Sequence, residues 1–406
     1  MKKRFTLGMV MALMLLVAVV TATISFETAR RWLNEGLRET EQERQRLSKI
    51  AEIMNYVDNF FVGPWDEKTV TDNAARGLVG GLGDRWSHYL SAEEFEAYRD
   101  GSSNQTVGIG IGVTQNEAED ALLVTEVYTD SPAEETGMRP GDEIIAIDGE
   151  LVSELGYYVA VERARGEENT RINLTLRRAG GRIIDVQTFR RMVAVEAVRS
   201  EILDGDIGYV RVRNFHSRVD DDFATAIDRL LEAEVGGLVI DMRYNPGGEL
   251  NVLVPMLDKL LPEGVIITLR NKAGVEDVRR SEPGEVALPM VVLINGESYS
   301  AAEFFAAALR EYDKAVLVGE NTSGKGYSQS TTELADGSAL LLSTNEYFTP
   351  DGESLAGVGL TPDITVASDD GLAFFAHDRE KDKPLQRAVQ SMRDTLDAAA
   401  AQLPAA

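Results

Sequence analysis

The strongest constraint on the fold is an alternation of apolar runs and amphipathic stretches from about residue 206 to residue 320. Apolar, strand-like runs occur at 207–215, 236–243, 264–270, 289–295 and 315–320. Helix-like stretches at 220–232, 250–261 and 301–312 separate most of them. Apolar strands that alternate with helices are typical of a largely parallel sheet covered by helices. The sequence therefore predicts an α/β core, which we place at residues 191–370.

Residues 102–190 have a different pattern. Alternating or apolar runs predict strands at 107–113, 121–128, 142–149, 171–178 and 182–189. The stretch 157–165 predicts a single helix. Short strands separated by turns are typical of a compact β-rich module. We therefore expect a β-rich domain over 102–190, inserted ahead of the α/β core.

The first 26 residues predict a membrane anchor. A basic head at 1–4 precedes an uncharged stretch at 5–26. As a helix this stretch is about 33 Å long, enough for the ~30 Å hydrocarbon core of a bilayer. Cleaved signal peptides have shorter apolar regions. We expect a cytoplasmic head and a single transmembrane span with the rest of the chain exported; a cleaved signal peptide and a buried core helix are the alternatives.

Further helices are expected at both ends. Residues 27–101 are rich in charged, helix-favouring residues and predict a helical stalk followed by two short helices, with a dimerising coiled coil as the alternative for 27–57. Ser91 and Glu94 have the spacing of a capping box. In the C-terminal region, 371–406, apolar residues at helical spacing predict one amphipathic helix before a short tail. These residues are Leu385, Val389, Met392 and Leu396.

Composition excludes several classes of protein. The net charge of −26 argues against nucleic-acid binding, which needs a basic face. The absence of cysteine excludes thiol nucleophiles, disulfides and Cys-ligated zinc. The three histidines, His88, His216 and His377, lack the spacing of a zinc-hydrolase motif. We therefore expect no metal site and no nucleic-acid partner.

Ser300 is the first candidate for chemistry. It follows an apolar strand and begins a helix in the segment 295–303 (NGESYSAAE). With Glu303 it forms a capping-box pattern, so a purely structural role is one interpretation. A nucleophile is the other, because N–H groups at a helix N-terminus can stabilise an oxyanion.

A serine nucleophile needs a base, and no histidine is close to Ser300 in the sequence. Lys325 is a candidate, because desolvation lowers the pKa of a lysine. It follows the apolar strand at 315–320. If residues 325–329 are extended, Gln329 points to the same face and can hydrogen-bond the amine. The alternative is a surface lysine in a glycine-rich turn.

Two glycine-containing turns present backbone N–H groups. Gly247 and Gly248 end the segment 241–248 (DMRYNPGG), which follows an apolar strand at the edge where α/β sheets usually place their sites. They are candidate oxyanion donors, or an ordinary turn. A second loop lies in the β-rich domain and can capture a peptide C-terminal carboxylate while the peptide adds as a strand. It comprises Gly108, Ile109, Gly110 and Ile111.

Together these motifs resemble the carboxyl-terminal processing proteases, also called tail-specific proteases, over roughly residues 45–365. The stretch 131–149 (SPAEETGMRPGDEIIAIDG) is similar to part of a PDZ domain, and GIGIGV (108–113) is similar to its carboxylate-binding loop. Other segments resemble successive blocks of the peptidase core: DMRYNPGG, NGESYSAAEF, AVLVGENTSGKGYSQ and YFTPDGESLAGVGLTPD. DRWSHYL (84–90) is similar to the block before the PDZ insertion.

The resemblance implies a Ser–Lys dyad of Ser300 and Lys325, with Gln329 beside the lysine, because the spacing matches that of the family. It implies an oxyanion site formed by backbone at Gly247 or Gly248 and at Ala301. It also implies a crotonase-like α/β peptidase core with an inserted PDZ domain.

The sequence departs from the family pattern at Tyr299 and Ser323. Both residues lie beside predicted catalytic residues but replace neither Ser300 nor Lys325. We therefore expect these departures to change the shape of the substrate subsites more than the activity.

We therefore expect a bacterial serine endopeptidase in the cell membrane with an extracytoplasmic catalytic body, or a secreted one if the segment 5–26 is cleaved. Its substrates would be exported proteins or peptides with apolar C-terminal tails, and no cofactor is needed. Homo-oligomers are compatible with this interpretation. A catalytically inactive PDZ adaptor on a protease scaffold is one alternative. A small-molecule enzyme of the crotonase type is another, but it leaves the PDZ-like insertion unexplained.

Overall fold

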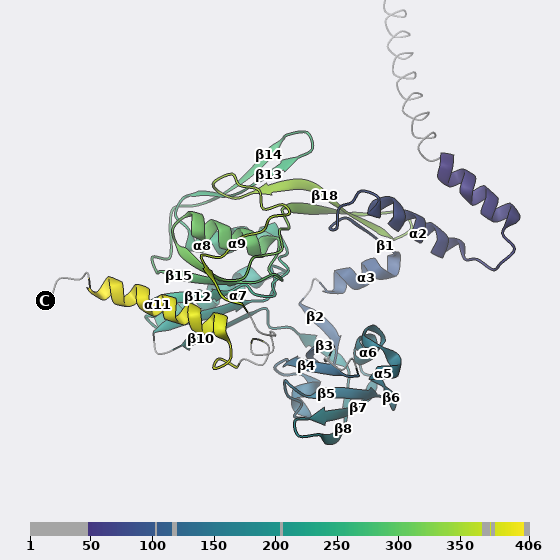
Figure 1. Ribbon diagram of the computed structural model, residues 1–406, viewed down its shortest axis with the longest axis horizontal. Helices are drawn as coiled ribbons and strands as arrows, with labels where there is room; N and C mark the ends of the chain where they lie inside the picture. Colours follow the sequence, from purple (N-terminus) through teal and green to yellow (C-terminus); the bar gives the residue numbers. More distant parts are fainter. Residues whose placement is uncertain are drawn as a thin grey trace, which may run out of the picture. The chain divides into compact units, whose positions relative to one another are not determined.

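The computed structural model describes residues 48–101, 104–115, 120–203, 206–367, 374 and 378–401 (Figure 1). The predicted head at 1–4, the anchor at 5–26 and most of the predicted stalk lie outside these residues, as does His377. None of the helices in the described part combines the length and apolar character that a membrane span requires.

The N-terminal region is helical, as predicted. Residues 48–60 form a helix within a first compact unit that ends at Val70. Two short helices follow, α2 (Glu67–Gly80) and α3 (Ala92–Gly101). The predicted capping box begins α3, because Glu94 accepts the N–H of Ser91 at 2.8 Å and Ser91 Oγ accepts the N–H of Glu94 at 3.3 Å.

The β-rich domain is built on a sheet of order β3-β4-β5-β7-β8 whose neighbouring strands are all antiparallel. Apolar residues of the sheet, among them Leu122, Ile144 and Leu174, form a core of their own. The strands are β3 (Ile111–Gln115), β4 (Leu122–Val127), β5 (Glu143–Ile147), β6 (Glu150–Leu151), β7 (Arg171–Arg178) and β8 (Arg182–Phe189). The helices are α4 (Pro132–Glu135), α5 (Val152–Leu155) and α6 (Tyr157–Ala164).

The prediction of one continuous strand at 107–113 is wrong. The run divides into β2 (Gln105–Gly108), which pairs with β9 (Arg191–Ala194), and β3, which belongs to the main sheet of the domain. The chain turns at Gly110, whose φ of +79° favours glycine, and a Cβ there would lie 2.3 Å from Ser131 Cβ. The break therefore follows from a backbone conformation that the alternation of apolar residues does not reveal.

The predicted parallel sheet is confirmed. Its order is β10-β11-β12-β15-β16-β19, and every neighbouring pair from β11 onwards is parallel, whereas β10 is antiparallel to β11. The strands are β10 (Val198–Leu203), β11 (Ile207–Val212), β12 (Gly237–Asp241), β15 (Met290–Ile294), β16 (Ala315–Gly319) and β19 (Ile364–Thr365).

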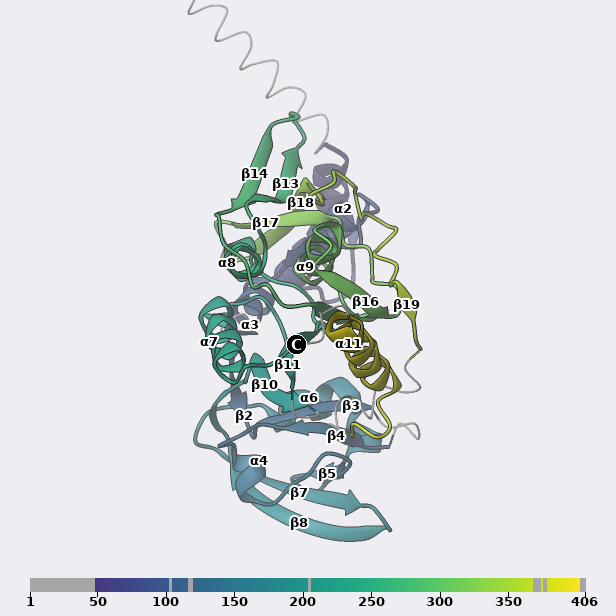
Figure 2. The same cartoon turned by 90° about the vertical axis from the view of Figure 1, so that its left-hand side faces the viewer.

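Helices cover both faces of this sheet (Figure 2). Leu238 and Ile240 of β12 pack with α7 (Val219–Glu232), α8 (Leu250–Leu260) and α9 (Ala301–Glu311). Val239, between them, packs on the other face with α11 (Lys383–Ala401), the predicted C-terminal amphipathic helix. Because successive side chains of a strand point to opposite faces, a strand buried on both sides must be apolar throughout.

A second, antiparallel sheet packs beyond α8 and α9. Its order is β1-β18-β13-β14, with β17 on β18. The strands are β1 (His88–Leu90), β13 (Gly264–Asn271), β14 (Glu276–Ser281), β17 (Tyr327–Glu333) and β18 (Ala339–Phe348). The segment 264–270 was predicted to belong to the α/β layer, and this is wrong: it is β13. Its apolar run packs against the same helices from the opposite side, so the pattern alone does not distinguish the two sheets.

Candidate active site

The candidate site lies where the parallel strands β12 and β15 end, the edge at which α/β sheets usually place their sites. Residues of the loops that follow these strands line a cleft of about 740 Å³. Five of the residues predicted from sequence line the same cleft: Gly247, Gly248, Ser300, Lys325 and Gln329. The structure therefore brings together three segments that are far apart in the chain.

Ser300 stands immediately before α9 and has a strained backbone. Its φ of 58° and ψ of −125° are rare for a residue with a side chain and cost on the order of 1–3 kcal/mol. This conformation turns the chain sharply from the sheet into the helix. The turn places Ser300 on the cleft wall and at the N-terminal end of α9, next to Ala301.

The carboxylate of Glu303 holds the serine turn and the lysine loop together. Its Oε2 accepts the N–H of Ser300 at 2.8 Å and the N–H of Lys325 at 2.9 Å. Its Oε1 accepts the N–H of Gly324 at 2.8 Å and the hydroxyl of Thr322 at 2.5 Å. The side chain is completely buried. Glu303 therefore caps α9, as the sequence predicted, and also fixes the loop that carries the lysine, which no local pattern indicated.

Lys325 is held in an aromatic and amide environment. Its Nζ donates a hydrogen bond to Gln329 Oε1 at 2.8 Å, as predicted for an extended segment 325–329. The Nζ atom lies 4.8 Å from the centroid of the Trp86 ring and 5.8 Å from that of Tyr299. The amide of Gln329 in turn donates to the carbonyl oxygen of Trp86. Within the described residues no hydrogen bond joins Nζ to Ser300 Oγ.

This environment favours the neutral amine. Burial lowers the pKa of Lys325 from its ordinary value, although the negative charges of Asp84 and Glu303 act to raise it. A lysine with a lowered pKa is a better general base near neutral pH than a solvated one.

Backbone N–H groups approach Ser300 from the glycine turn. A Cβ on Gly247, whose φ is +85°, would lie 2.8 Å from Ser300 Cβ, so the turn packs directly against the serine. The N–H of Gly247 is already used, since it donates to Asn245 Oδ1 at 2.8 Å. In the part of the chain that the structure describes, the N–H groups of Gly248 and Ala301 have no hydrogen-bond acceptor, so these two donors are available to a ligand.

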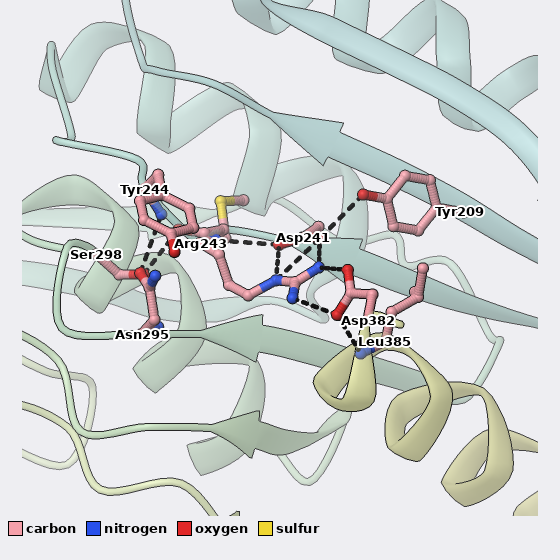
Figure 3. A network of polar contacts seen from close by, with 9 residues as sticks. Tyr209, Asp241, Arg243, Tyr244, Asn295, Ser298, Asp382 and Leu385 are labelled. Atoms are coloured by element: carbon pink, nitrogen blue, oxygen red, sulfur yellow. Dashed lines mark hydrogen bonds and ion pairs between the residues drawn. The ribbon is translucent and has the colours of Figure 1, made fainter. Parts of the chain in front are cut away.

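Side-chain and backbone hydrogen bonds connect the two loops of the site (Figure 3). Asn295 Oδ1 accepts the N–H of Tyr244 at 3.0 Å and lies 3.2 Å from Ser298 Oγ. Ser298 Oγ donates to the carbonyl of Met242 at 2.8 Å. The carbonyl of Asn245 accepts the N–H of Tyr299 at 3.1 Å. The glycine turn is thus tied to the loop that ends in the serine.

The predicted glycine loop of the β-rich domain lines a different cavity. A groove of about 360 Å³ runs between β3 and α6 and is lined by the whole segment 104–113. Val161, Ala164 and Arg165 of and next to α6 form its other wall. Because β3 is the end strand of its sheet, a peptide added there gains main-chain hydrogen bonds while α6 contacts its side chains.

The structure thus divides the predicted site residues between two places. Ser300, Lys325, Gln329 and the glycine turn line the cleft, and the loop at 108–111 lines the groove. Sequence analysis did not single out Trp86 or Asn245 as site residues, and it gave His216 no role although this residue lines the cleft. Trp86 and Asn245 act through contacts with distant segments, and both lie within motifs noted in the sequence, at 84–90 and 241–248.

Comparison with known proteins gives consistent results. The family model described as "Peptidase family S41" matches residues 206–366, and a PDZ-domain model matches residues 123–178. The chain is 34% identical over 331 residues to the carboxy-terminal-processing protease of Bartonella bacilliformis, covering 79% of this chain and 75% of that one. It is 30% identical to the carboxy-terminal processing protease CtpA of Bacillus subtilis, covering 87% and 76%.

Solved structures that are similar to this chain include the photosystem II D1 C-terminal processing protease. That likeness has 27% identity and a TM-score of 0.50, and it covers 77% of this chain and 85% of the other. A putative S41 protease from Bacteroides fragilis has a TM-score of 0.61 with 19% identity over 79% of this chain and 90% of the other, a likeness of fold alone.

Proposed function

Because the chain belongs to the carboxy-terminal processing proteases of peptidase family S41, which are serine-type peptidases, we propose that Ser300 and Lys325 are its catalytic dyad. We further propose that its PDZ domain selects substrates by an apolar C-terminal tail.

Acylation begins with the neutral amine of Lys325. Nζ turns from Gln329 towards Ser300 and accepts the hydroxyl proton as Oγ bonds to the scissile carbonyl carbon. The carbonyl oxygen becomes an oxyanion between the N–H groups of Gly248 and Ala301. When the carbon–nitrogen bond breaks, the Lys325 ammonium gives its proton to the leaving amine.

Deacylation reverses the use of the same groups. Lys325, again neutral, accepts a proton from a water molecule as the water oxygen attacks the acyl carbon. The oxyanion forms between the same two N–H groups. When the carboxylic acid product leaves, the Lys325 ammonium returns its proton to Ser300 Oγ. Lys325 therefore carries out every proton transfer in the cycle.

The environment of Lys325 carries this proposal. Its amine is shielded beside Trp86 and Tyr299, its pKa is lowered by burial, and its loop is fastened through Glu303 to the turn of Ser300. A structural or surface lysine has no need of such shielding. The strained backbone of Ser300 supports the same assignment, since strain is retained where the surroundings enforce it, and such positions cluster at active sites.

The role of the PDZ domain rests on the groove between β3 and α6. Its walls combine a glycine loop with apolar side chains such as Val161, which suits a carboxylate followed by apolar residues. The uncharged segment 5–26 supports membrane anchoring with the domain and cleft outside the cytoplasm, where exported proteins are the available substrates. The helix-covered parallel sheet supports a crotonase-like core.

The test uses the full chain in a mild detergent and an unstructured protein that ends in an apolar tail. We expect the wild type to cleave it and both Ser300→Ala and Lys325→Ala to lose cleavage by a factor of about 1,000 or more. Ser217→Ala and Lys272→Ala, which change exposed residues outside the cleft, are the matched controls. Intact-mass analysis of the fragments gives the rate and the cleavage sites.

Two outcomes would contradict the proposal. Undiminished cleavage in both dyad variants would exclude the dyad. Tail binding by the wild type without cleavage, and without labelling of Ser300 by a fluorophosphonate, would instead support an inactive adaptor, the interpretation favoured by the departures at Tyr299 and Ser323. Replacing the apolar tail with an acidic one tests the PDZ domain separately, because it should weaken binding but leave fluorophosphonate labelling unchanged.

A further inference from the structure

A fully buried arginine lies beneath the glycine turn. Arg243 is the second residue after β12, and its guanidinium lies between two carboxylates (Figure 3). Its Nη2 donates to Asp241 Oδ2 at 2.6 Å, and its Nε lies 3.0 Å from Asp241 Oδ1. On the other side Nη1 and Nη2 donate to Asp382 Oδ1 and Oδ2 at 2.7 and 2.8 Å. Each of the three nitrogens of this planar group therefore donates to a carboxylate oxygen.

Asp382 belongs to a distant part of the chain. It immediately precedes α11, and its Oδ1 also accepts the N–H of Leu385 at 3.0 Å, so it caps that helix. The apolar face of α11 is packed on the parallel sheet, through Leu385, Val389 and Met392. The carboxylate of Asp382 is therefore held by the C-terminal helix and is itself almost completely buried.

The turn that contains Gly248, one of the two oxyanion donors, begins at Arg243. The N–H of Arg243 donates to Asp241 Oδ1 at 3.1 Å, so the same carboxylate binds both its backbone and its side chain. Only Tyr244, Asn245 and Pro246 separate it from Gly247, which packs against Ser300. Arg243 thus lies five residues before Gly248, at the start of the same turn.

The ion pairs have no contact with the cleft. None of Asp241, Arg243 and Asp382 lines it. Burial acts to lower the pKa of Arg243, but the two aspartates hold it well above its ordinary value, so the group stays charged. Buried ion pairs are often no more stabilising than apolar residues of similar size, and in some proteins they contribute conformational specificity instead. Orientation of the turn is thus the function that these contacts serve best.

We propose that Asp382 is a positioning residue for catalysis: by holding Arg243 from the C-terminal segment, it orients the turn whose Gly248 N–H stabilises the oxyanion. This rests on the proposed function of Ser300 and Gly248. The reaction then depends on a residue that never touches the substrate and lies outside every segment that resembles the protease motifs.

The experiment compares Asp382→Asn, Asp382→Glu and Asp378→Asn in the full chain in detergent. Asparagine keeps the size of the side chain and one helix-capping oxygen but loses the paired carboxylate. Glutamate keeps the charge and displaces it by one methylene. Asp378 lies in the same loop and pairs with Lys381 at 2.8 Å, not with Arg243, so Asp378→Asn is the matched control.

For Asp382→Asn we expect kcat to fall by about tenfold to a hundredfold, with KM within about twofold of wild type, because only the transition state uses the oxyanion donors. The rate of fluorophosphonate labelling of Ser300 should fall in parallel, while the final extent of labelling stays complete. Asp382→Glu should give an intermediate kcat, and Asp378→Asn should match wild type.

Normalising kcat to the labelled serine separates positioning from simple loss of folded protein. A kcat per labelled serine equal to wild type in Asp382→Asn would overturn the proposal, as would an equal loss in Asp378→Asn. If Asp382→Asn does not fold, wild-type kcat per labelled serine in Asp382→Glu overturns it instead. Absence of Ser300-dependent cleavage in the wild type would be a failure of the proposed function, which is a different result.

Discussion

At the scale of single residues, the site depends on a position that has no room for a side chain. Gly247 packs against Ser300, and a Cβ there would lie 2.8 Å from the serine Cβ, 2.8 Å from the Tyr299 carbonyl and 2.9 Å from the Ala301 nitrogen. These neighbours are the first side-chain atom of Ser300 and two backbone atoms of the strained turn, which cannot move without displacing the nucleophile and the first N–H of α9.

Gly247→Ala is therefore expected to reduce kcat/KM by about 100-fold or more. Gly352 is a matched control, since its φ is also +85° but no atom lies within 4 Å of the position of a Cβ. Both substitutions carry the cost of an alanine in the left-handed region, about 1–2 kcal/mol. Thermal unfolding should therefore show a similar cost of backbone strain in the two variants, whereas peptide cleavage should fall only in Gly247→Ala. Equal activities would show that the contact with Ser300 is unimportant.

The negative charge near Lys325 predicts how kcat/KM depends on pH. The amine acts as a base in its neutral form, so activity rises as pH increases through its pKa. The carboxylate of Asp84 raises that pKa against the lowering effect of burial. Asp84→Asn removes the charge and should lower the pKa further, which moves the acid limb of the kcat/KM profile to lower pH.

The asparagine keeps the size of the side chain and an oxygen that accepts the N–H of Trp86, but its amide nitrogen does not accept the hydroxyl of Ser87 as Oδ2 does. Asp277→Asn removes an exposed charge that pairs with Arg279 and should leave the profile unchanged. A shift of the acid limb to higher pH in Asp84→Asn would contradict the assignment of Lys325 as the base.

At the scale of elements, substitutions in α6 test tail binding independently of catalysis. Val161 lines the groove opposite β3, whereas Val159, on the same helix, is about half exposed and does not line it. Val161→Asp places a carboxylate next to the apolar side chains and the C-terminal carboxylate of the bound peptide. We expect KM for an apolar-tailed substrate to rise about tenfold or more, which corresponds to the burial of one valine side chain, with the fluorophosphonate labelling rate unchanged.

Val159→Asp should leave KM within about twofold of wild type, because most substitutions of exposed residues have small effects. Val159 does not line the groove. Tail-peptide affinity, measured by fluorescence anisotropy, checks both variants directly. If Val161→Asp binds the tail as tightly as wild type while unfolding at the same temperature, the groove is not where tails bind.

The sequence predicted most strands of the parallel sheet, whose signal is local. The strands on either side of α7 are apolar runs separated by an amphipathic helix, so the parallel sheet follows from periodicity. Residues 327–333 (YSQSTTE) contain no apolar run, and β17 was missed because it is an exposed end strand. Similarly, the glycine, serine and lysine motifs were visible, whereas the contact of Glu303 with the N–H of Lys325 needed the folded chain to bring the two together.

At the scale of the whole molecule, charge is the dominant property. The net charge of −26 generates a negative field that acts on a flexible substrate before it reaches the cleft. Such steering acts mainly on association and is screened by salt, because the Debye length falls from about 30 Å at about 0.01 M to about 3 Å at about 1 M. Substrate charge should therefore change kcat/KM and leave kcat nearly constant.

Two unstructured substrates that share one cleavage site and one apolar tail, with lysine-rich and glutamate-rich flanks, test this prediction. At about 20 mM salt the lysine-rich substrate should have a kcat/KM larger by about tenfold, the lower end of the range for electrostatic steering. At about 1 M salt the ratio should approach one. A short uncharged peptide is the control and should show little dependence on salt. A ratio that persists at high salt would place the preference in direct contacts within the cleft, and a reversed ratio at low salt would mean that local positive charge near the cleft outweighs the field of the whole chain.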